Sequence, residues 1–440
     1  MTPKPTKLSR RQLVGSMAVA AGAVGAGLSF ASSSSVCGVD VLVVGGGIQG
    51  LLVLRRLLAA GYAAVLVDRG PLGGQQTCHS HVYIHQGHVY NNARFVERLR
   101  RVAPFWDELV RTSGLHLEAQ GSVYGFASAA SRDRWTTRWR APEIGLQYAA
   151  SDVPGALAGS ATVTCVTTPE YGLNGHDLVR KLAAPLAPHI GQVRAVRGFE
   201  VASAGLSVRR VVVETHTGAV LTIEPRLVVL CAGMGNAALL REVDARRTPP
   251  PRRVDVQEVH HGRMLVVRGR TLPRLAGFFP DHHGLLVVSR AAGDDTVWLV
   301  DYTADKARAD RATQWTRGVI EQLQRLVPRS LADPTMLRWG TYAAAKTEPS
   351  TRQFPERRDR VEAFGYENLL VSWPVKLTLA PLCADEILAA ARHILPPPPS
   401  ASLPAAWRDF RTDAAIAPER WETTTLLPWP EFVATHEQSR

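Results

Sequence analysis

Three glycines near the start of the chain have the spacing of a phosphate-binding turn. They follow an apolar run at 39–44 that has the composition of a buried parallel strand. Apolar residues at helical spacing continue from 48 to 60, and Gly61 ends that helix. In such a turn the first glycine permits a tight bend, the second admits a pyrophosphate, and the third packs the helix on the strand. The predicted contacts are Gly45, Gly47, Ile48, Gln49 and Gly50.

An acidic residue stands where a ribose would be recognised. Residues 63–67 form a second apolar run, and Asp68 follows it, 18 residues after Gly50. A carboxylate at this distance from the glycines accepts hydrogen bonds from ribose hydroxyls. We therefore predict a dinucleotide-binding unit in which Asp68 and its neighbour Arg69 contact the cofactor. This unit alone does not decide between a flavin and a nicotinamide.

Four histidines lie within ten residues, at positions 79, 81, 85 and 88. Imidazoles ligate zinc, but Cys78 is the only thiol in this stretch and the stretch has no acid, so we predict no metal site. Histidine also titrates near neutral pH and can therefore act as an acid or base toward a substrate.

The composition is that of a globular protein. Of 440 residues, 45% are hydrophobic and 20% are charged, which excludes a coiled coil or a collagen. A mean hydropathy of −0.05 excludes a polytopic membrane protein. Five scattered cysteines form neither a disulfide framework nor a zinc pair. The formal net charge is +12, but basic clusters interleaved with aromatics are lacking, so we expect no nucleic-acid partner.

The first 31 residues have the parts of a signal peptide. Basic residues including Arg10 and Arg11 precede a Gly/Ala-rich apolar stretch at 13–31, which ends in small residues. The paired arginines resemble a twin-arginine export signal. We expect the export machinery to be a partner and the protein to be carried across the cytoplasmic membrane. A retained membrane anchor is the alternative.

Three segments, at 74–88, 226–236 and 367–381, follow the glycine turn along the chain. Together they resemble the FAD-dependent oxidoreductases of the D-amino-acid oxidase (DAO) superfamily, over roughly 38–395. The first is similar to the loop that wraps the FAD pyrophosphate, the second to a strand ending in Ala-Gly, and the third to the C-terminal flavin signature. The resemblance implies FAD as the cofactor and further contacts at Thr77, His79, Ser80, Ala232, Gly233, Lys376, Leu377 and Thr378.

The resemblance also implies an α/β fold with two interleaved domains. A Rossmann-like FAD-binding domain would comprise 38–120, 161–245 and 341–395. An antiparallel β-sheet substrate domain would comprise 121–160 and 246–340, where short β runs alternate with loops. Residues 396–440 follow a proline run, and we expect them to form a tail anchored on the body by its tryptophans.

Two histidines of the first segment acquire roles through the resemblance. His85 stands where glycerol-3-phosphate dehydrogenases carry a histidine near the substrate, so we expect it to be the catalytic base. His79 stands where relatives bond a histidine to the flavin, so covalent attachment is an open alternative. Near the C-terminus this chain has Trp373, Pro374 and Lys376 where relatives usually have glycines. Lys376 would then place a positive charge near the flavin C2 carbonyl.

The substrate side of the site is less clearly marked. We select Arg290, Tyr342 and Lys346 as further candidate catalytic residues. An arginine facing the flavin would clamp a carboxylate through two parallel hydrogen bonds. Lys346 lies in a segment that returns to the flavin in relatives, where a lysine can act through water on flavin N5.

These features lead us to expect an FAD-dependent oxidoreductase that removes a hydride from a carbon of a C–N bond in a small, anionic amine or amino acid. Its electrons would pass to oxygen or to a respiratory carrier. A dehydrogenase of a hydroxy acid or polyol is one alternative. A flavin-binding protein that has lost catalysis is another, suggested by the altered segment 373–376.

Overall fold

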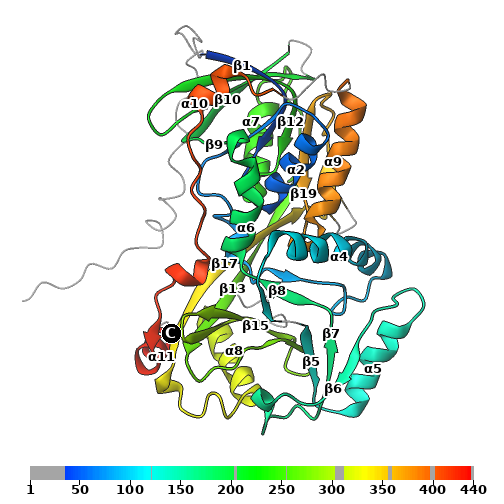
Figure 1. Cartoon of the computed structure of the whole chain (residues 1–440), viewed down its shortest axis with the longest axis vertical. Helices are drawn as coiled ribbons and strands as arrows, with labels where there is room; N and C mark the ends of the chain where they lie inside the picture. Colours follow the sequence, from blue (N-terminus) through cyan, green and yellow to red (C-terminus); the bar gives the residue numbers. More distant parts are fainter. Residues whose placement is uncertain are drawn as a thin grey trace, which may run out of the picture. The chain divides into compact units, whose positions relative to one another are not determined.

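A computed structural model describes residues 35–119, 121–202, 206–253, 255–302, 312–354, 359–396 and 402–437. Val36–Arg440 forms one compact unit that is built on two large sheets (Figure 1). The predicted signal peptide at 1–31 lies outside the described residues. Within those residues, no helix combines the length and the apolar character needed to cross a membrane.

The first sheet contains the predicted dinucleotide-binding unit. Its central strands β1 and β2 are parallel, with Val41 opposite Ala64, and β2 continues in parallel to β9. On the other side of β1 lies β12, which pairs in parallel with β19 and antiparallel with β11. The edge strand β10 then pairs antiparallel with β11. The strands are β1 (Ser35–Val44), β2 (Ala64–Asp68), β9 (Ile190–Gln192), β10 (Ala195–Val201), β11 (Val208–Glu214), β12 (Val220–Leu230), β18 (Arg360–Glu362) and β19 (Leu369–Trp373).

Both faces of this sheet are buried, which is why β1 is a continuous apolar run. Val41 and Val43 point into one core, while Leu42 and Val44 point into another. Figure 1 shows α2 and α9 side by side against the first of these faces. The helices of this part of the chain are α2 (Ile48–Ala59), α3 (Gln76–His79), α4 (Ala93–Ser113), α6 (Gly175–Ala183), α7 (Asn236–Asp244) and α9 (Ala380–Ile394).

The second sheet has nine strands in the order β20-β17-β13-β16-β15-β14-β5-β7-β6. Most neighbours are antiparallel, and β13 pairs with β17 from Gln257 opposite Pro349 to Arg268 opposite Arg338. The strands are β5 (Ser122–Phe126), β6 (Ala149–Ser151), β7 (Thr164–Thr168), β13 (Gln257–Gly269), β14 (Ala276–Phe279), β15 (Leu285–Ala292), β16 (Asp295–Tyr302), β17 (Arg338–Pro349) and β20 (Leu427–Pro428).

Smaller elements complete the fold. A third sheet has the order β3-β8-β4, with β3 (Tyr83–Ile84), β8 (Tyr171–Leu173) and β4 (Leu117–Ala119). Short 3-10 helices are η2 (Gly155–Leu157), η3 (Ala184–His189), η4 (Gly233–Gly235), η6 (Pro334–Met336), η7 (Leu377–Leu379) and η8 (Arg420–Thr423).

The α/β fold class that we predicted is confirmed, but the sheets divide the chain differently from our domain boundaries. We assigned 161–245 and 341–395 to the FAD-binding domain, whereas β7 and most of β17 run in the second sheet. We also expected short strands and loops at 121–160 and 246–340, where α5 (Ala129–Arg140) and α8 (Ala312–Leu326) are found. Local periodicity reveals a strand but not its partner, so strand pairing had to come from the structure.

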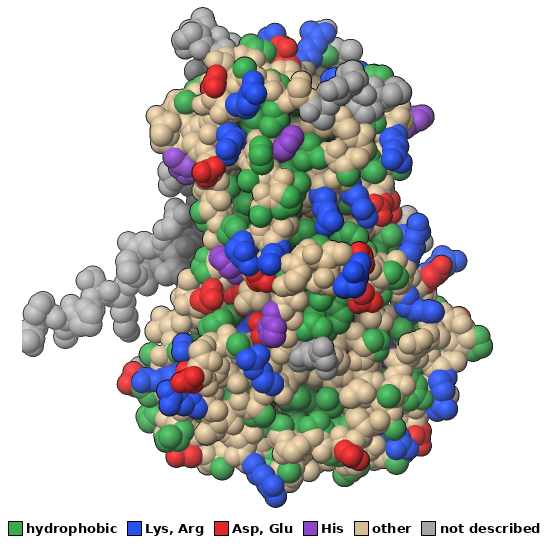
Figure 2. All heavy atoms as spheres, in the orientation of Figure 1, with side chains coloured by type: hydrophobic (Ala, Val, Ile, Leu, Met, Phe, Trp, Pro, Cys, Tyr) green, Lys and Arg blue, Asp and Glu red, His purple; other side chains and the backbone are tan. Residues whose placement is uncertain are grey.

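The C-terminal residues pack on the body through aromatic side chains. Trp407 of α10 (Ala405–Phe410) and Trp421 are buried, and the ring of Trp429 lies 4.8 Å from that of Trp339 between centroids. The last helix is α11 (Trp429–Glu437). On the face drawn in Figure 2, basic and acidic side chains are interspersed.

Candidate active site

At two positions of the turn between β1 and α2, any residue larger than glycine would clash with the backbone. Gly45 has a φ of +116°, and a Cβ there would lie 2.5 Å from the carbonyl oxygen of Cys231. A Cβ on Gly50 would lie 1.8 Å from the carbonyl oxygen of Gly45. Gly47 is different, because its φ is −74° and a Cβ there would find its nearest neighbour, Thr77 Oγ1, 3.4 Å away. The backbone at Gly47 is therefore open to a ligand.

The N-terminus of α2 has the properties of a phosphate site. No side chain caps the helix at Gly47, and the Ile48 N–H donates to Thr77 Oγ1 at 3.1 Å. Gln49 is only 4% exposed, yet neither its amide nitrogen nor its amide oxygen has a hydrogen-bond partner among the described residues. Buried amides are normally paired, so Gln49 suits a polar ligand at this turn.

The acidic residue after β2 closes on the same turn. The backbone N–H groups of Gly46 and Gly70 both donate to the Asp68 carboxylate, the latter at 2.7 Å. Burial raises the pKa of Asp68, against the lowering effect of these two bonds. Arg69 is exposed.

Three distant segments meet beside this turn. Gly233 in η4 has a φ of +54°, and a Cβ there would lie 2.9 Å from Gln76 Oε1 of α3. Thr347 Oγ1 of β17 donates to the same oxygen at 2.9 Å. Next to Gly233, the Ala232 N–H donates to Asn236 Oδ1 at 2.7 Å. The predicted contacts Thr77, Ala232 and Gly233 are thus brought together with β17.

The loop after α3 meets the segment after β19. The His85 N–H donates to Thr378 Oγ1 at 3.2 Å, and the Thr378 carbonyl accepts from Trp106 Nε1 at 2.8 Å. Val375 adopts a left-handed conformation with φ +61°, which turns the chain into Lys376 and then Leu377 of η7. Lys376 Nζ lies 5.5 Å from the centre of the Tyr90 ring. The structure therefore groups His85 with Lys376 and Thr378.

His85 lies between two tyrosine rings, and it is half-buried. Its ring centroid is 4.7 Å from that of Tyr83 and 5.8 Å from that of Tyr90. Burial lowers the pKa of His85 to about 3, where Glu170 opposes this shift and Lys376 adds to it. Its Nδ1 is buried and has no hydrogen-bond partner among the described residues. His85 is therefore neutral at neutral pH.

Glu170, at the turn between β7 and β8, holds the histidine loop in place and was missed in the sequence. It is fully buried, and burial raises its pKa, but the charge of His88 and hydrogen bonds from His88 and Tyr124 outweigh burial and lower the pKa. His88 Nδ1 is 3.1 Å from the carboxylate. Hydrogen bonds to Glu170 come from the hydroxyls of Tyr83 and Tyr124, at 3.1 and 2.6 Å, and from the N–H groups of Gln86, Gly87 and His88, at 2.8, 3.1 and 3.3 Å.

The predicted contacts His79 and Ser80, at the end of α3, differ in their surroundings. His79 is half-buried at the end of α3, where burial and the charge of Arg420 lower its pKa. The Ser80 hydroxyl donates to the Thr77 carbonyl at 3.1 Å, so it stabilises the end of the helix.

Arg290 does not fit the carboxylate clamp that we predicted. Its side chain is 0% exposed, and Nε lies 3.0 Å from a carboxylate oxygen of buried Glu419. Its Nη1 and Nη2 donate to the carbonyls of Ser289 and His81, at 3.2 and 2.8 Å. Protein acceptors therefore engage the whole guanidinium, and no sequence signal linked Arg290 to a residue of the tail.

The two candidates on β17 have different surroundings. Lys346 Nζ is 2.5 Å from an oxygen of buried Glu348, and His260 Nε2 is 3.5 Å from the same carboxylate group. Tyr342 packs in an apolar cluster with Trp421. Burial raises the pKa of Tyr342, and its hydroxyl has no hydrogen-bond partner in the described parts of the chain.

Comparison with known proteins places this arrangement in a family. The family model "FAD dependent oxidoreductase" (DAO) matches residues 40–390. The chain belongs to this family. The protein is therefore an FAD-dependent oxidoreductase that uses FAD as its cofactor and acts on a small-molecule substrate with an electron acceptor.

Individual relatives share most of the chain. The probable FAD-dependent oxidoreductase PA4991 of Pseudomonas aeruginosa is 28% identical over 379 residues, which cover 80% of this chain and 90% of that protein. Its crystal structure covers 88% of this chain and 99% of its own, with 25% identity and a TM-score of 0.68.

More distant structures share the fold. Glycine oxidase from Geobacillus kaustophilus is 17% identical, with a TM-score of 0.58, and covers 81% of this chain and 95% of its own. An L-amino acid deaminase from Proteus vulgaris is 16% identical, with a TM-score of 0.60, and covers 83% and 92% of the two chains.

The residues present fit FAD. The open backbone at Gly47, the uncapped α2 and the unpaired Gln49 amide suit its pyrophosphate, and Asp68 suits its ribose. When bound, FAD supplies a hydride acceptor.

Proposed function

We propose that the protein oxidises the carbon of a C–N bond in a small amine or amino acid. The observation that supports this most is the buried Nδ1 of His85, which has no hydrogen-bond partner among the described residues, in a loop that is bonded to Thr378. An ammonium group must lose a proton before its carbon can give up a hydride, and the Nδ1 atom of His85 can accept it only when the bound substrate raises the pKa of His85. A substrate carboxylate near Lys376 would do so, because a negative charge favours the protonated imidazole. Distant proteins of the same fold include a glycine oxidase and an L-amino acid deaminase, which supports an amine substrate.

The charge of the site favours a substrate that also carries a negative group. Lys376 lies close enough to His85 to lower its pKa, so a positive charge stands beside the base. Such a charge attracts a carboxylate and disfavours a substrate that is only cationic. Because Arg290 is engaged by Glu419, Lys376 is our candidate for this role in its place.

The test is an anaerobic titration of the FAD-loaded protein, followed by flavin absorbance. We expect small amino acids to bleach the oxidised flavin spectrum and hydroxy acids and polyols to leave it unchanged. Bleaching by hydroxy acids or polyols alone would replace our proposal with the alcohol dehydrogenase alternative. A flavin that dithionite reduces, but that neither substrate class reduces, would identify a protein without catalysis.

The role of His85 is tested by the same titration on variants. We expect His85→Asn to slow flavin reduction by roughly 10²–10⁴-fold, as loss of a general base does. His116→Asn changes an exposed histidine and should leave the rate unchanged. An unchanged rate in His85→Asn would remove His85 from the reaction.

We further propose that electrons pass to oxygen or to a respiratory carrier, and that residues 1–31 direct the protein across the cytoplasmic membrane. The first point is tested by whether air or an added quinone reoxidises the reduced flavin. The second depends on the paired arginines at 10 and 11.

A further inference from the structure

A short segment near the C-terminus, residues 412–421, lies along the loop that leads into α3; we call it the strap. The Leu72 N–H donates to the Ala415 carbonyl at 2.8 Å, and the Ala417 N–H donates to the Leu72 carbonyl at 3.0 Å. These bonds form a parallel bridge between Leu72 and Ile416. The strap thus adds a backbone pairing to a loop that belongs to the cofactor site.

The paired loop is in direct contact with the phosphate turn. The Gly73 N–H donates to the Gly46 carbonyl at 3.0 Å. A Cβ on Gly46 would lie 2.3 Å from Leu72 Cδ2, so Leu72 packs against the turn itself. The strap therefore contacts the glycine turn indirectly, through Leu72.

The strap also binds the ends of α3 and α6. The Ala417 carbonyl lies 3.7 Å from Cys78 Sγ and 2.9 Å from His176 Nδ1. Burial and the nearby charges of Glu419 and Glu422 raise the pKa of the Cys78 thiol to about 12. Cys78 lies between the two predicted contacts Thr77 and His79. The strap therefore contacts the segment from Leu72 to Cys78 at both of its ends.

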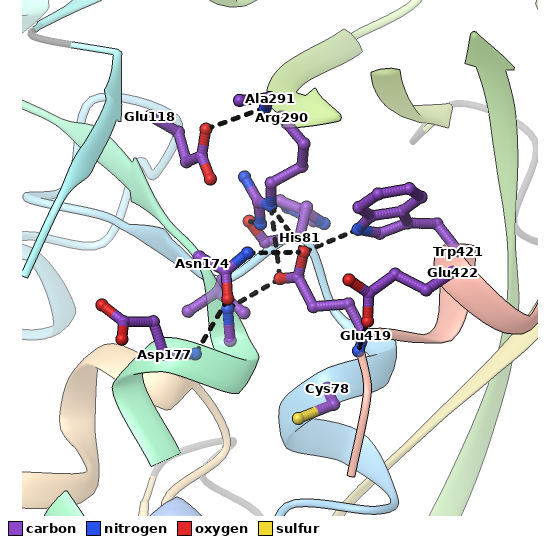
Figure 3. Close-up of polar contacts among 12 residues, drawn as sticks. Cys78, His81, Glu118, Asn174, Asp177, Arg290, Ala291, Glu419, Trp421 and Glu422 are labelled. Atoms are coloured by element: carbon purple, nitrogen blue, oxygen red, sulfur yellow. Dashed lines mark hydrogen bonds and ion pairs between the residues drawn. The ribbon is translucent and has the colours of Figure 1, made fainter. Parts of the chain in front are cut away.

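Glu419 carries the largest share of the polar contacts of the strap. It is 1% exposed and accepts from the Gly175 N–H at 2.7 Å and from Trp421 Nε1 at 2.6 Å. Arg290 Nε is 3.0 Å from the same carboxylate, and Arg290 Nη2 donates to the His81 carbonyl at 2.8 Å. Figure 3 shows the side chains of Glu419 and Trp421 from the strap and of Arg290 from β15 converging next to Asn174, the residue before α6.

These contacts form a chain from Glu419 to Arg290 and from Arg290 to the backbone at His81. An arginine in this position needs a carboxylate, because a buried charge without its partner is strongly unfavourable. Glu419 supplies that carboxylate, and it thereby fixes the side chain that holds the loop. The family model ends at residue 390, so Glu419 lies beyond the matched range.

We propose that Glu419 is a positioning residue of the FAD site, which acts through Arg290 to fix the loop at 79–82 against the cofactor. The strap is then a part of the cofactor site rather than a tail that only covers the surface. This proposal depends on FAD as the cofactor and not on the substrate.

The test compares three full-length variants with the unaltered protein: Glu419→Gln, the pair Arg290→Gln with Glu419→Gln, and Glu431→Gln. Each is titrated as apoprotein with FAD, and its melting temperature and the visible circular dichroism of its flavin are recorded. Glu431 is an exposed acid of the same C-terminal region, so it is the matched control.

We expect Glu419→Gln to lower the melting temperature and to raise the FAD dissociation constant about tenfold, the effect of losing one hydrogen bond to the loop. The double variant should regain most of the melting temperature, because the unpaired charge is gone. It should keep the raised dissociation constant, because a glutamine side chain at position 290 is too short to hold the His81 carbonyl. Glu431→Gln should change neither value.

Two results would overturn the proposal. One is a double variant with the FAD affinity of the unaltered protein, and the other is a Glu419→Gln protein that melts earlier but binds FAD equally well. Where Glu419→Gln alone does not fold, the double variant decides. Where FAD is bound covalently, the flavin circular dichroism of the double variant is the readout, and an unaltered signal counts against the proposal.

Discussion

His85 and Glu170 illustrate how one buried carboxylate can hold a loop, here residues 85–88, in one conformation. Glu170 accepts hydrogen bonds from the three successive N–H groups of residues 86–88, and it faces the ring of His88. The loop is thereby fixed directly after His85. The His85 ring, in contrast, keeps Nδ1 free of any hydrogen-bond partner in the described chain. The backbone of the loop is therefore fixed by hydrogen bonds, whereas the Nδ1 atom of His85 is not engaged by any described residue.

The low pKa of His85 predicts a particular pH dependence of stability. Its pKa is about 3 in the folded protein, against 6.5 for an unperturbed histidine, so below pH 6.5 only the unfolded chain takes up this proton. Stability from His85 is thus present above pH 6.5 and is lost as the pH falls toward 3, by at most about 1.4 kcal/mol per pH unit.

We expect His85→Asn to flatten the stability profile between pH 4.5 and 6.5, measured by urea unfolding at a series of pH values. The window excludes Glu170, because its pKa is lowered from 4.5 and its stabilising effect is lost only below that value. The His116→Asn variant serves as the reference, since other histidines contribute equally to both profiles. Parallel profiles for the two variants would contradict the low pKa of His85.

Single residues were predictable where their neighbours in the sequence identify them. His85 could be selected because it lies in a histidine-rich stretch that resembles a flavin loop, and its catalytic role stays a prediction. Glu170 and Glu419 lie in stretches that match no motif of the resemblance. Glu170 has partners 46 to 87 residues away along the chain, and Glu419 is bonded to Arg290 and Gly175, which are 129 and 244 residues away. No local pattern encodes those pairings.

At the scale of elements, glycines in the turn between β1 and α2 have two different roles: one allows close packing, and the other leaves space for a ligand. Gly50 is needed for packing, because a Cβ would overlap the Gly45 carbonyl at 1.8 Å. Gly47 has ordinary dihedral angles, and a Cβ there would meet only Thr77 Oγ1, at 3.4 Å. A methyl group at Gly47 would therefore occupy the space that the cofactor backbone contact requires.

This difference predicts opposite effects of two alanine substitutions. Gly47→Ala should leave the melting temperature of the apoprotein nearly unchanged while it weakens FAD binding about tenfold or more. Gly50→Ala should destabilise the apoprotein by about 1–3 kcal/mol, because the helix must move away from the strand. Calorimetry of the apoproteins and FAD titration separate the two. Equal FAD affinity in Gly47→Ala would mean that no ligand approaches the backbone there.

Elements formed by local sequence were predicted well, and elements defined by distant pairing were not. The strand–turn–helix–strand unit at 39–68 was found because its apolar run, glycines and helical spacing are contiguous. The sheet membership of β7 and β17 depends on strands β5 and β13, which lie far away in the sequence. The local pattern of a strand is the same in either sheet.

At the scale of the whole molecule, the cofactor site is assembled from segments that span most of the chain. The turn at 45–50 meets η4 near 233, β17 near 347 and the strap at 412–421 through the contacts of Leu72, Gln76 and Thr347. None of these segments forms a site by itself. FAD binding therefore requires a folded chain, and a chain exported unfolded would have to find FAD outside the cytoplasm.

This requirement gives the paired arginines a testable role. A twin-arginine signal serves proteins that are exported folded, so replacing Arg10 and Arg11 together by lysine keeps the positive charge but should block export. We expect the double variant to accumulate in the cytoplasm with FAD bound, as measured by cell fractionation and flavin absorbance. Replacing Lys4 and Lys7 by arginine is the matched control and should leave export unaffected. Normal export of the lysine variant would show that the protein leaves by another route or carries no such signal.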